Sequence, residues 1–192
     1  MKIMGGLAAG AVFGVFTSLA NALSSPYTAL GAPITGTPWG ATAKVLSLLL
    51  DAGWSWAALA VVAGLLAGTP PLGALAGPLA LIAATATYYA ADHLVVNAGS
   101  DGLIWAVFAV FFGPLLGMTG AAVRRPGPTG LLAALTVPVG AAVQMAVLPP
   151  RPHLTITPAI AVAEAVVWTA SAAGAAWALH RFLAERRAVR AR

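Results

Sequence analysis

The fold class of this chain is decided by LIWAVFAVFFGPLLGMTGAAV, Leu103–Val123, a run without a single charged side chain. A helix needs roughly 20 consecutive apolar residues to cross a bilayer. Runs of similar length recur at Ile3–Leu23, Ala43–Ala67, Pro71–Ala91, Gly130–Leu148 and Pro158–Leu183. The sequence therefore predicts an all-α integral membrane protein, built as a bundle of about six transmembrane helices.

The composition agrees with this prediction. The 192 residues are 60% hydrophobic and 8% charged, and their mean hydropathy is +0.89, which is outside the usual balance of a soluble domain. Six spans with short connections leave no room for a soluble domain, so residues 1–192 are expected to form a single polytopic domain. The absence of cysteine excludes disulfides, thiolate catalysis and cysteine metal sites.

Most of the basic residues behind the net charge of +5 lie in two short parts of the sequence. Seven of the ten basic residues are Arg124 and Arg125 and the arginines of the tail, about 181–192. The positive-inside rule then places the N-terminus, the Arg-Arg loop and the basic tail on the cytoplasmic side of the membrane. The basic residues thus orient the chain, or contact anionic membrane lipid, and we expect no nucleic-acid partner.

One predicted helix ends in an unusual group of polar side chains. Thr85, Tyr88, Tyr89 and Asp92 are spaced i, i+3, i+4 and i+7, so they share one face of an α-helix. A polar stripe on an apolar helix needs a polar partner or a cavity to face.

Other polar side chains fall at a similar depth of the predicted bundle. Under the topology above, the outer half or its rim contains Asn21, Lys44, Ser47, Asp51, Trp54, Ser55, Gln144, Glu164 and Trp168. An ionised carboxylate at the centre of a membrane helix costs roughly 2.5–3.5 kcal/mol by insertion scales, so Asp51 and Glu164 should not face lipid. We expect the tyrosine-containing stripe to face an outer-half cavity shared with these two acids.

Two alternatives stay open for these residues. The acids could instead pair between helices, Lys44 with Asp51, and Asp92 with His93 or Arg151. The tryptophans could belong to an aromatic belt at the membrane interface.

The sequence contains none of the common hydrolase, metalloprotease or P-loop motifs, and no paired aspartate cluster. Magnesium-dependent prenyl transfer, which uses such clusters, is therefore not expected, and we predict no metal and no cofactor.

Isolated carboxyl groups in an apolar pocket can hold a proton and act as general acids. The candidate catalytic residues are Glu164, Asp92 and Asp51. Aromatic rings can stabilise a cation. The candidate substrate-binding residues are Trp54, Tyr88, Tyr89, Trp105, Trp168, Asn21 and Gln144.

A resemblance points in the same direction. The segments DAGWSWAALAVVAGLLAG, Asp51–Gly68, and GALAGPLALIAATATYYAADH, Gly73–His93, resemble a group of small actinobacterial membrane proteins. That group is similar to the membrane-integral terpene cyclases that close farnesyl chains attached to indoles or cyclic dipeptides. The resemblance implies a protonation-started cyclisation of a lipophilic prenylated substrate. It covers about the first four spans and matches no catalytic motif, so the three acids are nominated on physical grounds.

A different class fits the same pattern. The chain also resembles the substrate-binding components of energy-coupling-factor vitamin transporters, which have about six helices, a lid formed by the first loop and a docking face of small residues on helix one. Here Gly6, Gly10 and Gly14 would form the docking face and Ser24–Gly40 the lid. A small proton-coupled carrier is a third possibility, because buried carboxyl groups also form proton relays. The oligomeric state is not predicted.

Overall fold

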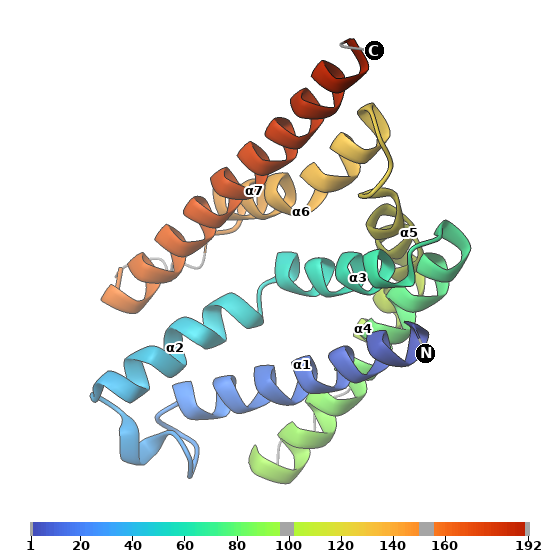
Figure 1. Ribbon diagram of the computed structural model, residues 1–192. Helices are drawn as coiled ribbons and strands as arrows, with labels where there is room; N and C mark the ends of the chain where they lie inside the picture. The colour runs from blue at the N-terminus through green and yellow to red at the C-terminus, as the bar shows by residue number, and fades with distance from the viewer. Residues whose placement is uncertain (1, 97–101, 150–155, 191–192) are drawn as a thin grey trace.

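The computed structural model describes residues 2–96, 102–149 and 156–190, and within these ranges it is all-helical (Figure 1). The helices are α1 (Lys2–Ser24), α2 (Pro38–Leu50), α3 (Gly53–Ala67), α4 (Pro70–Val96), α5 (Leu103–Ala122), α6 (Pro128–Val147) and α7 (Pro158–Arg190), with a 3-10 turn η1 at Ala32–Ile34. Helices α1, α3, α4 and α5 pack together, and α6 and α7 form a second pair that contacts α2, α3 and α5.

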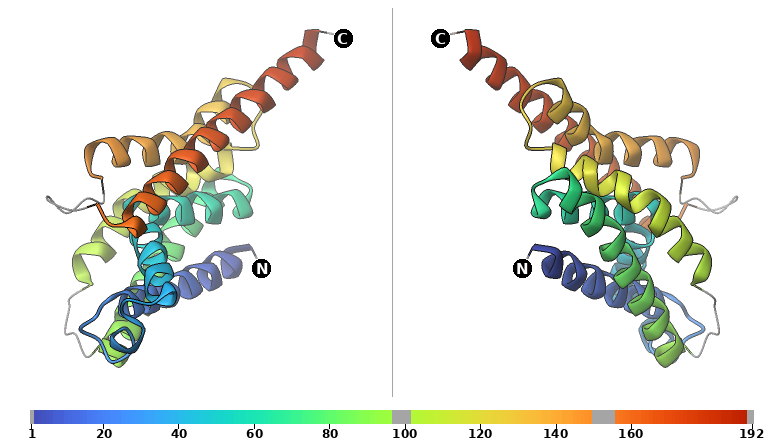
Figure 2. Two further views of the ribbon diagram at one scale, coloured as in Figure 1. Left: turned by 90° about the vertical axis from the view of Figure 1, so that its left-hand side faces the viewer. Right: turned by 90° about the vertical axis from the view of Figure 1, so that its right-hand side faces the viewer.

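Five of the predicted spans are confirmed as helices long and apolar enough to cross a bilayer. They are α1, α4, α5, α6 and α7. Helix α7 continues past the predicted end at Leu183 to Arg190, and its 33 residues correspond to a length of about 50 Å. Its C-terminal part projects beyond the other helices in every view (Figures 1 and 2).

The prediction of one continuous span over Ala43–Ala67 is wrong. The chain forms two helices there, α2 and α3, whose axes differ in direction by 63° at a break after Leu50. Asp51 ends α2, and Ala52 is extended, with φ −73° and ψ 141°. Ser47 therefore lies on α2 and Trp54 on α3, with Asp51 at the break between them.

Side chains support the broken backbone. The Ser55 hydroxyl lies 2.6 Å from the carbonyl oxygens of both Leu50 and Ala52. The Trp54 N–H donates to Gln144 Oε1 of α6 at 2.8 Å. Because helix ends leave backbone groups without intrahelical partners, these contacts satisfy groups that would otherwise be left unpaired inside the protein.

The small residues of α1 pack against α4. A Cβ atom on Gly10 would overlap the Ala80 carbonyl group, and one on Gly14 would overlap that of Ala84. Between the same helices the Thr87 hydroxyl donates to the Ala11 carbonyl at 3.0 Å. The small-residue face of α1 is thus used for packing within the chain.

Helices α3, α4 and α5 meet through glycines in the same way. At Gly117 of α5, the backbone approaches both Gly64 of α3 and Gly73 of α4 so closely that a Cβ atom at any of the three would overlap its neighbour. Gly113 is likewise in contact with Pro78 of α4. The main chains of the three helices are therefore in direct contact around Gly117.

A separate group of contacts connects the α5–α6 turn to α7 at the arginine-rich end. Arg181 donates through Nη1 to the Val123 carbonyl at 2.8 Å and through Nε to Glu185 Oε1 at 3.0 Å. Glu185 also accepts from the Gly127 N–H at 3.3 Å. Part of the basic tail is thus fixed to the loop that follows Arg124 and Arg125.

Candidate functional site

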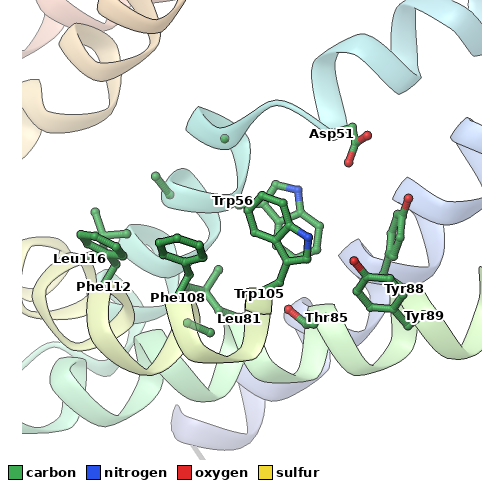
Figure 3. A pocket seen from close by; sticks show the side chains of 13 residues that line it. Asp51, Trp56, Leu81, Thr85, Tyr88, Tyr89, Trp105, Phe108, Phe112 and Leu116 are labelled. Carbon is green, nitrogen blue, oxygen red and sulfur yellow. The ribbon is translucent and has the colours of Figure 1, made fainter. Parts of the chain in front are cut away.

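A cavity of about 470 Å³ lies between α3, α4 and α5 next to the break after α2 (Figure 3). Its volume falls within the range of about 300–1,000 Å³ that is usual for small-molecule sites. It is lined by Asp51, Gly53, Trp56, Ala57, Leu81, Thr85, Tyr88, Tyr89, Trp105, Phe108, Ala109, Phe112 and Leu116. These residues come from three segments that are far apart in sequence, 51–57, 81–89 and 105–116, so the cavity exists only in the packed structure.

The polar groups of the cavity are gathered at one end. Asp51, Tyr88 and Tyr89 lie there together, and the apolar side chains extend away from them (Figure 3). Asp51 is presented by the helix break, whereas the two tyrosines project from the last turns of α4. A ligand in this cavity would therefore meet polar groups at one end and hydrocarbon at the other.

Asn21 of α1 organises this polar end. Its side-chain N–H₂ group donates to Asp51 Oδ2 at 3.2 Å and to the Tyr88 hydroxyl oxygen at 3.0 Å. Its oxygen accepts from the Ser47 hydroxyl at 2.6 Å. One amide thus connects α1, α2, the break and α4, and it orients the carboxyl group and the phenol that line the cavity.

The apolar arm of the cavity follows one face of α5. Trp105, Phe108, Phe112 and Leu116 are spaced i, i+3, i+7 and i+11, a pattern that keeps them on one side of a helix. Trp105 is 56% exposed and Phe112 is 52% exposed. The cavity is therefore open along α5.

The aromatic rings form a continuous series of contacts behind the acid. Trp56 packs edge to face on Phe13, with ring centroids 5.4 Å apart, and contacts Tyr88 at 6.2 Å. Tyr88 packs in turn on Tyr89 at 5.1 Å. Such edge-to-face pairs stabilise the positions of the rings, so the wall beside Asp51 is fixed by mutual ring contacts.

The structure brings together about half of the residues predicted from the sequence. Asp51, Tyr88, Tyr89 and Trp105 line the cavity, as does Thr85 of the polar stripe. Asn21 bonds to two of these residues from α1. The stripe on α4 thus faces a cavity that contains an acid from another segment, as expected.

The other predicted residues lie elsewhere. Trp54 and Gln144 line a second cavity of about 40 Å³ between α2, α3, α6 and α7. Glu164 of α7 is 8% exposed and Trp168 is 47% exposed, and neither lines either cavity. Asp92, one turn past the tyrosines, does not line them either. The expectation of one cavity shared by three acids is therefore not met.

The predicted pairings between charged groups have separate outcomes. In the described part of the chain, Lys44 is exposed and makes no ion pair with Asp51, whose carboxyl group is hydrogen-bonded to Asn21. Arg151, one of the two predicted partners of Asp92 beside His93, lies outside the described residues.

Several lining residues were missed by the sequence analysis, most clearly Trp56, Phe108 and Phe112. The signal for the two phenylalanines was present, because they continue the spacing of Trp105 along one face of α5. Trp56 carried no such signal, since its direction depends on where α3 begins after the break.

The first loop does not cover the cavity. No residue of Ser24–Gly40 is among the lining residues, although this segment was the predicted lid of a vitamin-binding component.

Comparisons with known proteins give no further constraint on the function, since no family model, no curated protein and no solved structure matches the chain. The site is therefore interpreted from its own geometry.

Proposed function

We propose that this chain is a multi-pass protein of a bacterial plasma membrane, with the N- and C-termini cytoplasmic. Five long apolar helices, and the bent pair α2 and α3 counted as one more span, support six crossings. Trp105 lies near the start of α5, and Arg124 lies 19 residues later, just after the helix ends. In a helix, 19 residues correspond to about 28 Å. The arginine-rich end would then lie at the cytoplasmic face, and the Asp51 end of the cavity in the outer half.

Within that membrane, the cavity binds a prenyl-type lipophilic molecule and cyclises it, with Asp51 as the proton donor. The observation that carries this proposal is a single carboxyl group at one end of a cavity whose remaining wall is almost entirely aromatic and aliphatic. Because the cavity is open along α5, a hydrocarbon chain can enter sideways from the bilayer. The chain would lie along Trp105, Phe108 and Phe112.

The reaction is an isomerisation and consumes no co-reactant. The carboxylic acid of Asp51 gives its proton to a carbon–carbon double bond or to an epoxide oxygen. The electron pair of a second double bond then forms the ring bond and moves the positive charge along the chain. Loss of a proton to the Asp51 carboxylate ends the reaction and restores the acid.

The other groups of the cavity have supporting roles in this scheme. The rings of Trp56, Tyr88 and Trp105 offer negative π-faces to the carbocation, an interaction that strengthens when water is excluded. Asn21 is a positioning residue, because it holds the carboxyl and phenol groups without lining the cavity. Metal ions play no part in the scheme.

The transport component is less well supported. Its docking face on α1, represented by Gly10 and Gly14, is covered by α4, and its lid does not reach the cavity. A proton-coupled carrier keeps one supporting observation, because a broken helix with an acid at the break is a feature of carrier binding sites.

The direct test uses membranes from cells that produce the chain, incubated with farnesylated and epoxyfarnesylated acceptors. Mass spectrometry should detect a product isomeric with its substrate. The product should disappear with Asp51→Asn and persist with Glu185→Gln, an acid at the opposite end of the fold. If Asp51→Asn membranes with equal protein form the product, the assignment of the proton donor is refuted. Loss with Glu164→Gln instead would move the reaction away from this cavity.

A further inference from the structure

We infer that the cavity is a binding site for lipophilic ammonium ions, with the cationic head between Asp51 and the rings of Tyr88, Tyr89 and Trp105 and the hydrocarbon chain along α5. This goes beyond the proposed cyclisation, because the ligand is a stable cation and no reaction is needed. It rests on the cavity itself and not on catalysis.

The charge of the cavity selects a cation. Of the thirteen lining residues, Asp51 alone carries a formal charge, and no lysine, arginine or histidine is among them. The Asn21 amide donates a hydrogen bond to Asp51 but supplies no positive charge. The proposed cyclisation starts from protonated Asp51, whereas a bound ammonium group would favour its ionised form, because an opposite charge stabilises the carboxylate. The ammonium group would then be the counter-ion of Asp51.

The rings beside the acid add a second attraction that is specific for cations. An ammonium group is attracted to a ring when it lies within about 6 Å of the centroid. The centroids of Tyr88 and Tyr89 are 5.1 Å apart, and those of Tyr88 and Trp56 are 6.2 Å apart. Asp51 lines the same end of the cavity as Tyr88 and Tyr89 (Figure 3), so a cation in contact with Asp51 would lie beside more than one ring, an arrangement that suits quaternary ammonium groups.

The apolar arm explains why the cation must carry a hydrocarbon chain. From Trp105 to Leu116 the lining face of α5 extends over 12 residues, about 16 Å along a helix. Apart from Thr85 of α4, the residues facing this arm are apolar. A small ammonium ion without a chain would leave that surface unfilled, so its affinity should be much lower.

The test measures equilibrium binding of radiolabelled decyltrimethylammonium to the full chain in nanodiscs of zwitterionic lipid. Its neutral analogue, in which carbon replaces the nitrogen, should compete at least tenfold more weakly, and so should tetramethylammonium. Asp51→Asn should weaken binding of the labelled cation at least tenfold. Asp92→Asn, the same substitution one turn beyond the cavity, should leave its affinity within twofold.

Because Asp51 lies at the helix break, its replacement could weaken binding through a loss of folding. A variant of one ring away from the break tests the inference separately. Trp105 is exposed, so Trp105→Leu should fold normally and bind at least threefold more weakly, whereas Trp105→Phe keeps a ring and should retain most of the affinity. Equal competition by the cation and its neutral analogue, or unchanged binding in folded Asp51→Asn, would overturn the inference. A chain that binds the cation but forms no cyclised product would refute the cyclase proposal and leave this inference standing.

Discussion

Replacing Gly10 with alanine tests the close contact between α1 and α4 on which the polar end of the cavity depends. A methyl group at residue 10 would lie 2.9 Å from the Ala80 carbonyl carbon and closer still to its oxygen. Ordinary van der Waals contact begins at 3.4 Å, so the two helices must separate by at least about 0.5 Å to relieve this carbon–carbon overlap alone.

The expected effect follows from two opposing terms. Overpacking a close contact costs roughly 1–3 kcal/mol, while alanine regains up to about 1 kcal/mol over glycine in helix propensity. We therefore expect Gly10→Ala to lower the free energy of unfolding by about 1–2 kcal/mol, or the melting temperature by roughly 2–8 °C for a chain of this size. Asn21 lies 11 residues farther along α1, so its bonds to the cavity should weaken as well.

Thermal unfolding of the purified chain in detergent measures this effect. Gly5 and Gly6 supply matched controls, because a Cβ atom at Gly5 has no neighbour within 4 Å and one at Gly6 would lie an ordinary 3.4 Å from Ala63 Cβ. Both control alanines should melt at or slightly above the temperature of the unchanged chain. If Gly10→Ala melts together with them, the backbones of α1 and α4 do not touch as described.

Two other substitutions probe the polar contacts of the fold. Gln144→Leu removes the acceptor of the Trp54 N–H. It should lower the free energy of unfolding by about 1–3 kcal/mol, because this backbone donor is left without a partner. Thermal unfolding measures the loss against Val143→Leu, a substitution at the exposed neighbouring residue, and equal losses in the two variants would contradict the prediction. Asn21→Ala removes three side-chain hydrogen bonds and should destabilise the chain by roughly 1–3 kcal/mol. Ser24→Ala, which removes only a local hydroxyl bond, should change the melting temperature little, so a similar loss in both variants would argue against the network.

Hydropathy was sufficient to predict five of the long helices but not the break at Asp51. Over a window of about 20 residues, one aspartate among leucines and alanines hardly changes the average, so Ala43–Ala67 has the hydropathy of a single span. The break is instead supported by Gln144, which lies 90 residues after Trp54. Local sequence carries no information about a partner at that distance.

The break also explains the mixed outcome for the tryptophans. A single helix over Ala43–Ala67 would place Trp54 on the same face as Ser47 and Asp51, which are seven and three residues before it. Because α3 starts anew after an extended residue, that phase is lost, and Trp56 lines the cavity in place of Trp54.

The expected depth of each residue in the predicted bundle was a useful but incomplete guide to the site. It grouped Asp51 with Tyr88 and Tyr89 correctly, since all three belong to the same end of the packed helices. It could not decide which helices are neighbours, so Glu164 of α7 was assigned to the same cavity although α3, α4 and α5 form its walls. Which helices pack side by side depends on close contacts at glycines, and a hydropathy profile carries no information about these contacts.

The meeting of α3, α4 and α5 at Gly64, Gly73 and Gly117 limits how the cavity can be redesigned. Past Leu116 the cavity ends where main chains touch, so no side chain can be shortened there to make room for a longer guest. Variation in guest size, whether by natural drift or by engineering, would have to occur at the open side near Trp105. The closed end therefore keeps its shape when side chains are replaced, and substitutions at the open side can change which guests are selected.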